Sequence, residues 1–133
     1  MEKDFSRKFL QKLGKRLRKN ENDYQDIDDL SIYRRTFDNT LVKSGEMLNQ
    51  YLIKNDNNFI LSGRLKRNKS IIRKLIREPN MDLSRMSDIA GLRIIVKDIE
   101  SQLQLSSVVE SSMDTEKINN YVDTKNNYRA IHI

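Results

Sequence analysis

The chain has 133 residues, which is enough for one compact domain with its own hydrophobic core. It carries 25 Lys and Arg against 19 Asp and Glu, and this net charge of +6 favours an anionic partner such as a nucleotide, a nucleic acid or an acidic membrane. The lack of cysteine excludes disulfides, thiolate metal sites and cysteine nucleophiles. No apolar run approaches the roughly 18 residues of a membrane span and no signal peptide is evident, so we expect a cytoplasmic protein without membrane contact.

The N-terminal part, residues 1–58, is expected to be a helical segment. Five apolar residues recur at helical spacing among Lys and Arg and predict a basic amphipathic helix: Phe5, Phe9, Leu10, Leu13 and Leu17. This helix is expected to pack onto the domain, with contact to RNA or a membrane as the alternative. The acidic stretch 21–29 predicts a linker and an N-cap, and residues 30–53 predict a second helix.

Residues 59–61 predict a short buried strand that Ser62 and Gly63 end. The next fourteen residues, 64–77, contain seven cations and no acid. Their apolar positions, Ile71, Ile72, Leu75 and Ile76, predict a helix that ends near Pro79.

The remaining residues predict one longer strand, a helix and two short strands. The nearly continuous apolar run 92–96 is typical of a strand that is buried on both faces. A helix is expected around 103–113, and two short strands are expected at 118–122 and 128–133. This order predicts an α/β (α+β-like) fold, in which helices flank a mixed sheet of about four strands within residues 59–133.

The basic segment is a candidate phosphate site. The turn expected at Ser62 and Gly63 would present backbone N–H groups and a positive helix end to phosphate. Ser70 and Lys74 are four residues apart and share one helix face, while Arg64 and Lys66 lie where the helix is entered. A solvated basic surface is the alternative, and the spacing is not that of a Walker loop.

Asp88 is a candidate metal ligand because it stands just before the apolar run, with Arg93 close behind. Magnesium takes oxygen ligands, usually one or two carboxylates plus substrate phosphates. A helix cap or an ion pair is the structural alternative for Asp88.

The C-terminal residues form a third candidate. Alternation along a strand would place Tyr128 and His132 on one face, and an exposed tyrosine beside Asn126 could stack on a base. His132 is the only histidine, so a histidine-cluster metal site is excluded. A core tyrosine and a structural histidine are the alternatives.

Three segments in this order resemble the synthetase domain of the RelA/SpoT family. They are SGRLKRNKSIIRKL at 62–75, SDIAGLRIIV at 87–96 and YVDTKNNYRAIHI at 121–133. The resemblance covers 59–133 and implies a partial, nucleotidyltransferase-like synthetase core of the small synthetase-only or toxin type. The hydrolase half of long members is not expected, because it needs several histidines.

The resemblance implies a donor site for ATP on the first segment. Arg64 would lie at the adenine, and Lys66, Ser70 and Lys74 would hold the phosphates. Asp88 matches the aspartate that binds magnesium.

The resemblance also implies the acceptor side. Arg93 matches a basic residue that supports the nucleotide site, and His132 matches the histidine at the end of the third motif, so both are catalytic candidates with Asp88. Tyr128 matches the tyrosine that stacks on guanine, with Lys125 and Asn126 beside it. The turn before Tyr128 lacks the usual Pro and Gly, which leaves the acceptor open.

The activity that the resemblance implies is that of a GTP pyrophosphokinase, a transferase that makes the alarmone (p)ppGpp of the stringent response from ATP and GDP or GTP. One alternative is a toxin that pyrophosphorylates the 3′ end of tRNA, and another is an inactive nucleotide- or RNA-binding module. The family has a second metal-binding glutamate about ten residues beyond the histidine. No residue of this sequence matches that glutamate, so we expect either a fragment of a longer protein, which we favour, or a degenerate relative, inactive by itself in both cases. A homo-oligomer or an antitoxin is a possible protein partner.

Overall fold

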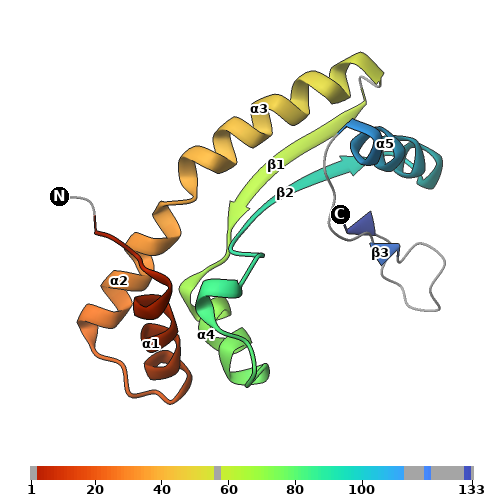
Figure 1. The fold of residues 1–133 in the computed structure, drawn as a ribbon. Coiled ribbons are helices and arrows are strands. Elements are labelled where there is room, and N and C mark those ends of the chain that lie inside the picture. The colour runs from red at the N-terminus through yellow and green to blue at the C-terminus, as the bar shows by residue number, and fades with distance from the viewer. Residues whose placement is uncertain (1–2, 56–57, 113–118, 121–130, 133) are drawn as a thin grey trace. The chain divides into compact units, whose positions relative to one another are not determined.

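The computed structural model describes residues 3–55, 58–112, 119–120 and 131–132 (Figure 1). The chain forms two compact units, one comprising Met1–Val42 with Gly63–Gly91 and the other comprising Lys43–Ser62 with Leu92–Ile133. None of the described helices combines the length and the apolar character that crossing a bilayer requires.

The first unit contains three helices and a 3₁₀ turn around one core. They are α1 (Arg7–Arg18), α2 (Tyr24–Arg35), α4 (Asn68–Arg77) and η1 (Leu83–Arg85). The apolar stripe of α1 packs on α4 and η1, as its spacing predicted. The buried members of this core are Leu10, Leu13, Leu17, Leu30, Ile71, Leu75, Leu83, Met86 and Ile89.

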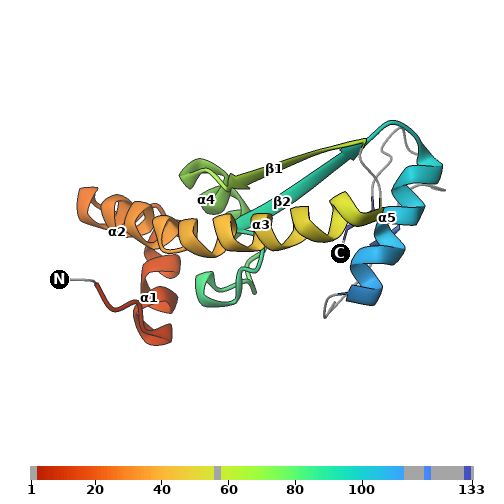
Figure 2. The same cartoon turned by 90° about the horizontal axis from the view of Figure 1, so that it is seen from above.

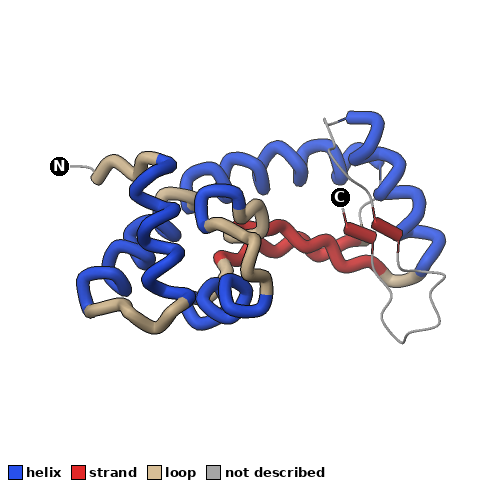
Figure 3. Tube along the Cα trace, turned by 60° about the horizontal axis from the view of Figure 1, so that its bottom comes forward, coloured by secondary structure: helices blue, strands red, loops and turns tan. Residues whose placement is uncertain are grey.

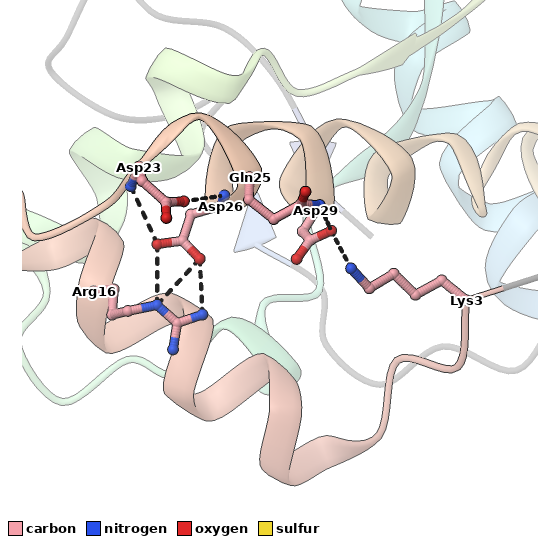
Figure 4. Close-up of polar contacts among 6 residues, drawn as sticks. All are labelled: Lys3, Arg16, Asp23, Gln25, Asp26 and Asp29. Carbon is pink, nitrogen blue, oxygen red and sulfur yellow. Dashed lines mark hydrogen bonds and ion pairs between the residues drawn. The ribbon is translucent and has the colours of Figure 1, made fainter.

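The acidic stretch is a linker and N-cap only as far as Asp23, as predicted, and its remainder belongs to helix α2, where the linker prediction was wrong. Asp23 is the N-cap of α2 and forms a capping box with Asp26. Asp26 and Asp29 are buried within α2 because each meets a cation: Arg16 binds Asp26 from α1, and Lys3 binds Asp29 (Figure 4). The long helix expected at 30–53 is also two helices, since α2 ends at Arg35 and α3 (Asp38–Asn55) begins after a short turn.

The second unit has a smaller core between helices and strands. The buried residues Leu48, Leu52 and Leu105 come from α3 and α5 (Ile99–Ser112), and half-buried apolar residues of β1 (Phe59–Leu65) and β2 (Ala90–Val96) pack on them. β1 pairs with β2, and the two arrows point in opposite directions in Figure 1. The helix α5 begins just beyond the end of β2 (Figure 2).

The strand β2 is covered on one face only, contrary to the prediction of a strand buried on both faces. Leu92, Ile94 and Val96 are the half-buried residues that pack on the core of the second unit. Arg93 and Ile95 point to the opposite side and are exposed. The difference arises because an apolar run predicts a strand but does not determine whether one or both of its faces are covered.

The α+β class is confirmed, with the described strands arranged as two pairs, drawn red in Figure 3. The second pair is antiparallel and joins β3 (Asn119–Asn120) to β4 (Ile131–His132), with Asn119 opposite His132. Among the described residues the two pairs are separate sheets, where the sequence predicted one mixed sheet of about four strands.

Candidate functional site

Two lysines and one aspartate from three separate segments meet in the first unit. Lys66 Nζ lies 2.9 Å from Asp88 Oδ2, and Lys74 Nζ lies 2.9 Å from Asp88 Oδ1. Lys66 directly follows β1, Lys74 is on α4 and Asp88 precedes β2. The backbone holds these segments together, because Lys66 N donates to Ile89 O at 2.6 Å.

The lysines of this cluster are more covered than the carboxylate that they share. The side chains of Lys66 and Lys74 are 14% and 16% exposed, against 47% for Asp88. Burial alone would raise the pKa of Asp88, but the hydrogen bonds from Lys74 and Lys66 outweigh it and hold the pKa below its usual value. The three charged groups therefore leave one positive charge in excess at neutral pH.

Helix α2 supports the start of α4 and the residue before it. Arg34 Nε donates to the backbone oxygen of Lys66 at 2.7 Å, and Asn68 Nδ2 donates to Ser31 Oγ at 2.9 Å. The other side-chain atom of Asn68, Oδ1, is buried without a hydrogen-bond partner among the described residues. The sequence did not identify Arg34, because nothing in its helical spacing separates it from its exposed neighbour Arg35.

The end of α4 is held by Arg18 of α1. Arg18 Nε donates to Leu75 O at 2.5 Å, and its Nη2 donates to Glu78 O at 3.2 Å and to Met81 O. A guanidinium at this position satisfies carbonyls that the helix leaves unpaired and complements the negative end of its dipole. Both ends of the helix that carries Lys74 are thus fixed by the N-terminal helices.

The structure places the other predicted donor-side residues without bringing them into the cluster. Arg64 is exposed on β1, and Ser70 is half-buried on α4. Neither forms an ion pair or a side-chain hydrogen bond with the residues that the structure describes.

Two of the predicted acceptor-side residues belong to the second unit. Arg93 is exposed on β2 in the second unit, and His132 belongs to β4. Tyr128, Asn126 and Lys125 lie outside the described residues.

Two details of the predicted phosphate segment were wrong. Ser62 and Gly63 do not form a turn, because β1 continues through them to Leu65, and α4 begins only at Asn68. On α4, Ile71 and Leu75 are fully buried as predicted, whereas Ile76 is 55% exposed. The apolar face is therefore narrower than the sequence indicated, since only one side of α4 meets the core.

Asp88 fits a magnesium ion that the substrate helps to bind. The described residues contain no group of three or more His, Cys, Asp or Glu side chains that could hold a metal without further ligands. Magnesium commonly uses one or two carboxylates and completes its shell with phosphates and water. Asp88 can supply one such carboxylate, and the nearby ammonium groups suit the phosphates.

Fold and site together define a basic α+β domain in which Lys66, just after β1, and Lys74, on α4, both contact the carboxylate of Asp88. The model of a family described as a region found in RelA / SpoT proteins matches residues 63–133, more than half of the chain. The chain belongs to this family, whose enzymes are pyrophosphokinase-type transferases that use ATP and magnesium. No curated protein matches the chain significantly.

Proposed function

We propose that the chain carries an ATP-dependent pyrophosphokinase domain that converts GDP or GTP to (p)ppGpp, with residues 59–133 as its synthetase core. The observation that carries this proposal is the cluster of Lys66, Lys74 and Asp88, whose members all fall within the family match. A donor site needs fixed cations for phosphate beside a carboxylate for magnesium, and this cluster holds both.

The ion pairs of the cluster are suited to exchange with a triphosphate. Asp88 is half exposed, so its pairs with the lysines contribute little stability, on the order of 1 kcal/mol or less. Phosphate oxygens can therefore take over the ammonium groups of Lys66 and Lys74 at low cost. Asp88 is then free to bind magnesium, which would neutralise charge on the phosphates.

Phosphoryl transfer of this kind depends on alignment and charge neutralisation more than on covalent chemistry by the protein. The acceptor 3′-oxygen attacks the β-phosphorus of ATP, the bond from that phosphorus to the α–β bridging oxygen breaks, and AMP leaves. The hydroxyl proton is released to water. Lys66 and Lys74 hold the phosphates in place for this attack.

The remaining site residues keep the roles that the family resemblance gives them. Arg64 would contact the adenine and Ser70 a phosphate, while Arg93 and His132 would support the transfer. The acceptor base would stack on Tyr128 beside Asn126 and Lys125.

A tRNA 3′ end is the second candidate acceptor. Two features favour it: the turn before Tyr128 lacks the Pro and Gly of the guanine-binding members, and the exposed residues of α1 are all basic. The same 3′-hydroxyl chemistry would then act on a nucleic acid.

In an intact version of the protein, transfer of label from ATP marked at the β-phosphate to GDP, GTP or tRNA tests the proposal and identifies the acceptor. Lys74→Gln and Asp88→Asn should each lower transfer by at least about 100-fold, because each removes a charge from the donor site. Their matched controls, Lys69→Gln on the same helix and Asp28→Asn on α2, alter exposed residues and should leave transfer within about twofold.

The affinity of the chain by itself for ATP with magnesium distinguishes a nucleotide-binding module from a chain that has no donor site. Binding that needs Lys74 and Asp88, without transfer to any acceptor, would support the nucleotide-binding module. Binding and transfer that are indifferent to both residues would refute the donor site.

A further inference from the structure

Helix α1 is one of two strongly basic segments of the chain that contain no acid. Helix α1 contains six Lys and Arg residues and no acid. The other nineteen basic residues of the chain's 25 are balanced by its 19 acidic residues. Outside α1 the sequence is therefore formally neutral, because acids elsewhere balance the second acid-free basic segment, 64–77.

Four lysines form a single row along this helix. At 100° per residue, Lys8, Lys12, Lys15 and Lys19 fall within about 60° of one another and span about 16 Å of helix length. The buried residues Leu10, Leu13 and Leu17 occupy the opposite side of the helix. All four lysines are exposed, and we call them the lysine row.

Two arginines near the end of the helix already bind other residues of the chain, whereas the lysine row forms no such contacts among the described residues. Arg16 binds Asp26, and Arg18 binds the carbonyls at the end of α4. None of the four lysines forms an ion pair with a residue that the structure describes. Packing and internal pairing thus account for the arginines and the leucines but leave the row without a role in the fold.

We propose that the lysine row binds the phosphodiester backbone of a nucleic acid. Regularly spaced, flexible ammonium groups suit a chain of phosphates, and they give affinity without reading sequence. An anionic membrane is the less fitting partner, because a helix that lies on a bilayer inserts its apolar face and this face of α1 is already in the core. The proposal does not depend on the pyrophosphokinase activity, since the row lies apart from the Lys66, Lys74 and Asp88 cluster in sequence.

Binding of the whole chain to a labelled single-stranded RNA of mixed sequence, measured without ATP at several salt concentrations, tests this proposal. The triple variant Lys8→Gln/Lys12→Gln/Lys15→Gln should weaken binding at least about tenfold. It should also make the slope of log K against log salt shallower by about 2, because each of the three lost phosphate contacts contributes roughly 0.7. The matched control Lys43→Gln/Lys54→Gln/Lys97→Gln removes the same charge from exposed positions and should change affinity less than threefold.

Further arms identify the partner and exclude a folding defect. If duplex DNA also binds through the same lysines, the row recognises the phosphate backbone in general. If RNA binds and duplex DNA does not, the partner is an RNA. Lys12→Gln should give a partial loss with an unchanged circular dichroism spectrum. Equal losses in the two triple variants, no binding of either nucleic acid, or stronger row-dependent binding to phosphatidylserine vesicles would each overturn the proposal.

Discussion

The two compact units of the chain differ in how completely they bury their apolar residues. Among the described residues, the first unit has nine buried apolar side chains in one core and the second has three. Of the eleven large apolar side chains that are exposed among the described residues, seven belong to the second unit. The first unit also contains all the ion pairs found among the described residues.

This contrast explains why the candidate donor site lies in the first unit. A donor site that holds one triphosphate in a fixed position gains from a fixed backbone beneath its lysines, because less conformational entropy is then lost on binding. Arg18 and Arg34 supply that restraint by fixing the two ends of the segment that carries Lys66 and Lys74. Substitutions in the two cores test the contrast directly, and substitutions at Arg16, Asp26 and Arg34 then test the contacts that distinguish the first unit.

Shortening one core leucine in each unit should destabilise them unequally. Leu13 and Leu52 are both fully buried, the first in the larger core and the second in the smaller. Leu13→Ala should lower the free energy of unfolding by about 4 kcal/mol and Leu52→Ala by about 2 kcal/mol, because a small, half-exposed core can collapse around the cavity. Urea denaturation followed by circular dichroism measures the loss.

Amide hydrogen exchange shows which unit each substitution affects. Leu13→Ala should raise exchange mainly in α1, α2 and α4, and Leu52→Ala mainly in α5, β1 and β2. A uniform rise throughout the chain in both variants would mean that the units unfold together, and the contrast would then have no thermodynamic meaning.

Removing Arg16 should cost about 3 kcal/mol of stability. Arg16 makes a two-pronged contact to Asp26, whose side chain is only 8% exposed, and Arg16→Ala would leave that carboxylate buried without its partner. The neighbouring exposed residue gives the control, since Lys15→Ala should change stability by about 0.5 kcal/mol or less. Denaturation midpoints measured in parallel would contradict the prediction if the two variants were equally stable.

The pH dependence of the same pair checks its electrostatic origin. The hydrogen bonds from Arg16 hold the pKa of Asp26 below its ordinary value of 3.8, despite the burial that would raise it. The pair therefore stabilises the fold fully above about pH 5 and loses this contribution as the pH falls through the folded-state pKa. The native chain and Asp26→Asn should therefore differ in free energy of unfolding above about pH 5, and this difference should shrink as the pH falls through the folded-state pKa.

Arg34 should affect ATP binding through Lys66 rather than by direct contact. Because Arg34 Nε holds the backbone oxygen of Lys66, Arg34→Ala should weaken ATP binding about tenfold in a calorimetric titration. The adjacent Arg35→Ala removes the same charge from an exposed position and should change it less than twofold. In a Lys66→Gln background Arg34→Ala should add little, since residues that act through one contact are not additive. A full tenfold loss in that background would show that Arg34 acts independently of Lys66.

The sequence predicted a helix or strand well where the spacing of apolar residues within that element was sufficient evidence. The leucines of α1, and Ile71 and Leu75 of α4, are buried as their spacing indicated. The family resemblance implied that the cations from Arg64 to Lys74 and Asp88 serve one site. Lys66 and Lys74 do meet Asp88, whereas Arg64 is not part of this cluster. The prediction of a linker missed the burial of Asp26 and Asp29 in α2, because the cations that pair with them come from other segments of the chain.

The sequence by itself determined the periodicities, the excess of positive charge and the family motifs, because these depend on residue type and spacing alone. Tertiary structure decided which acids are buried, which face of β2 is covered and which arginine supports Lys66. Those outcomes depend on contacts between residues that are ten to sixty positions apart. A pattern shows which face of an element must be covered, but only the folded chain supplies the residues that cover it.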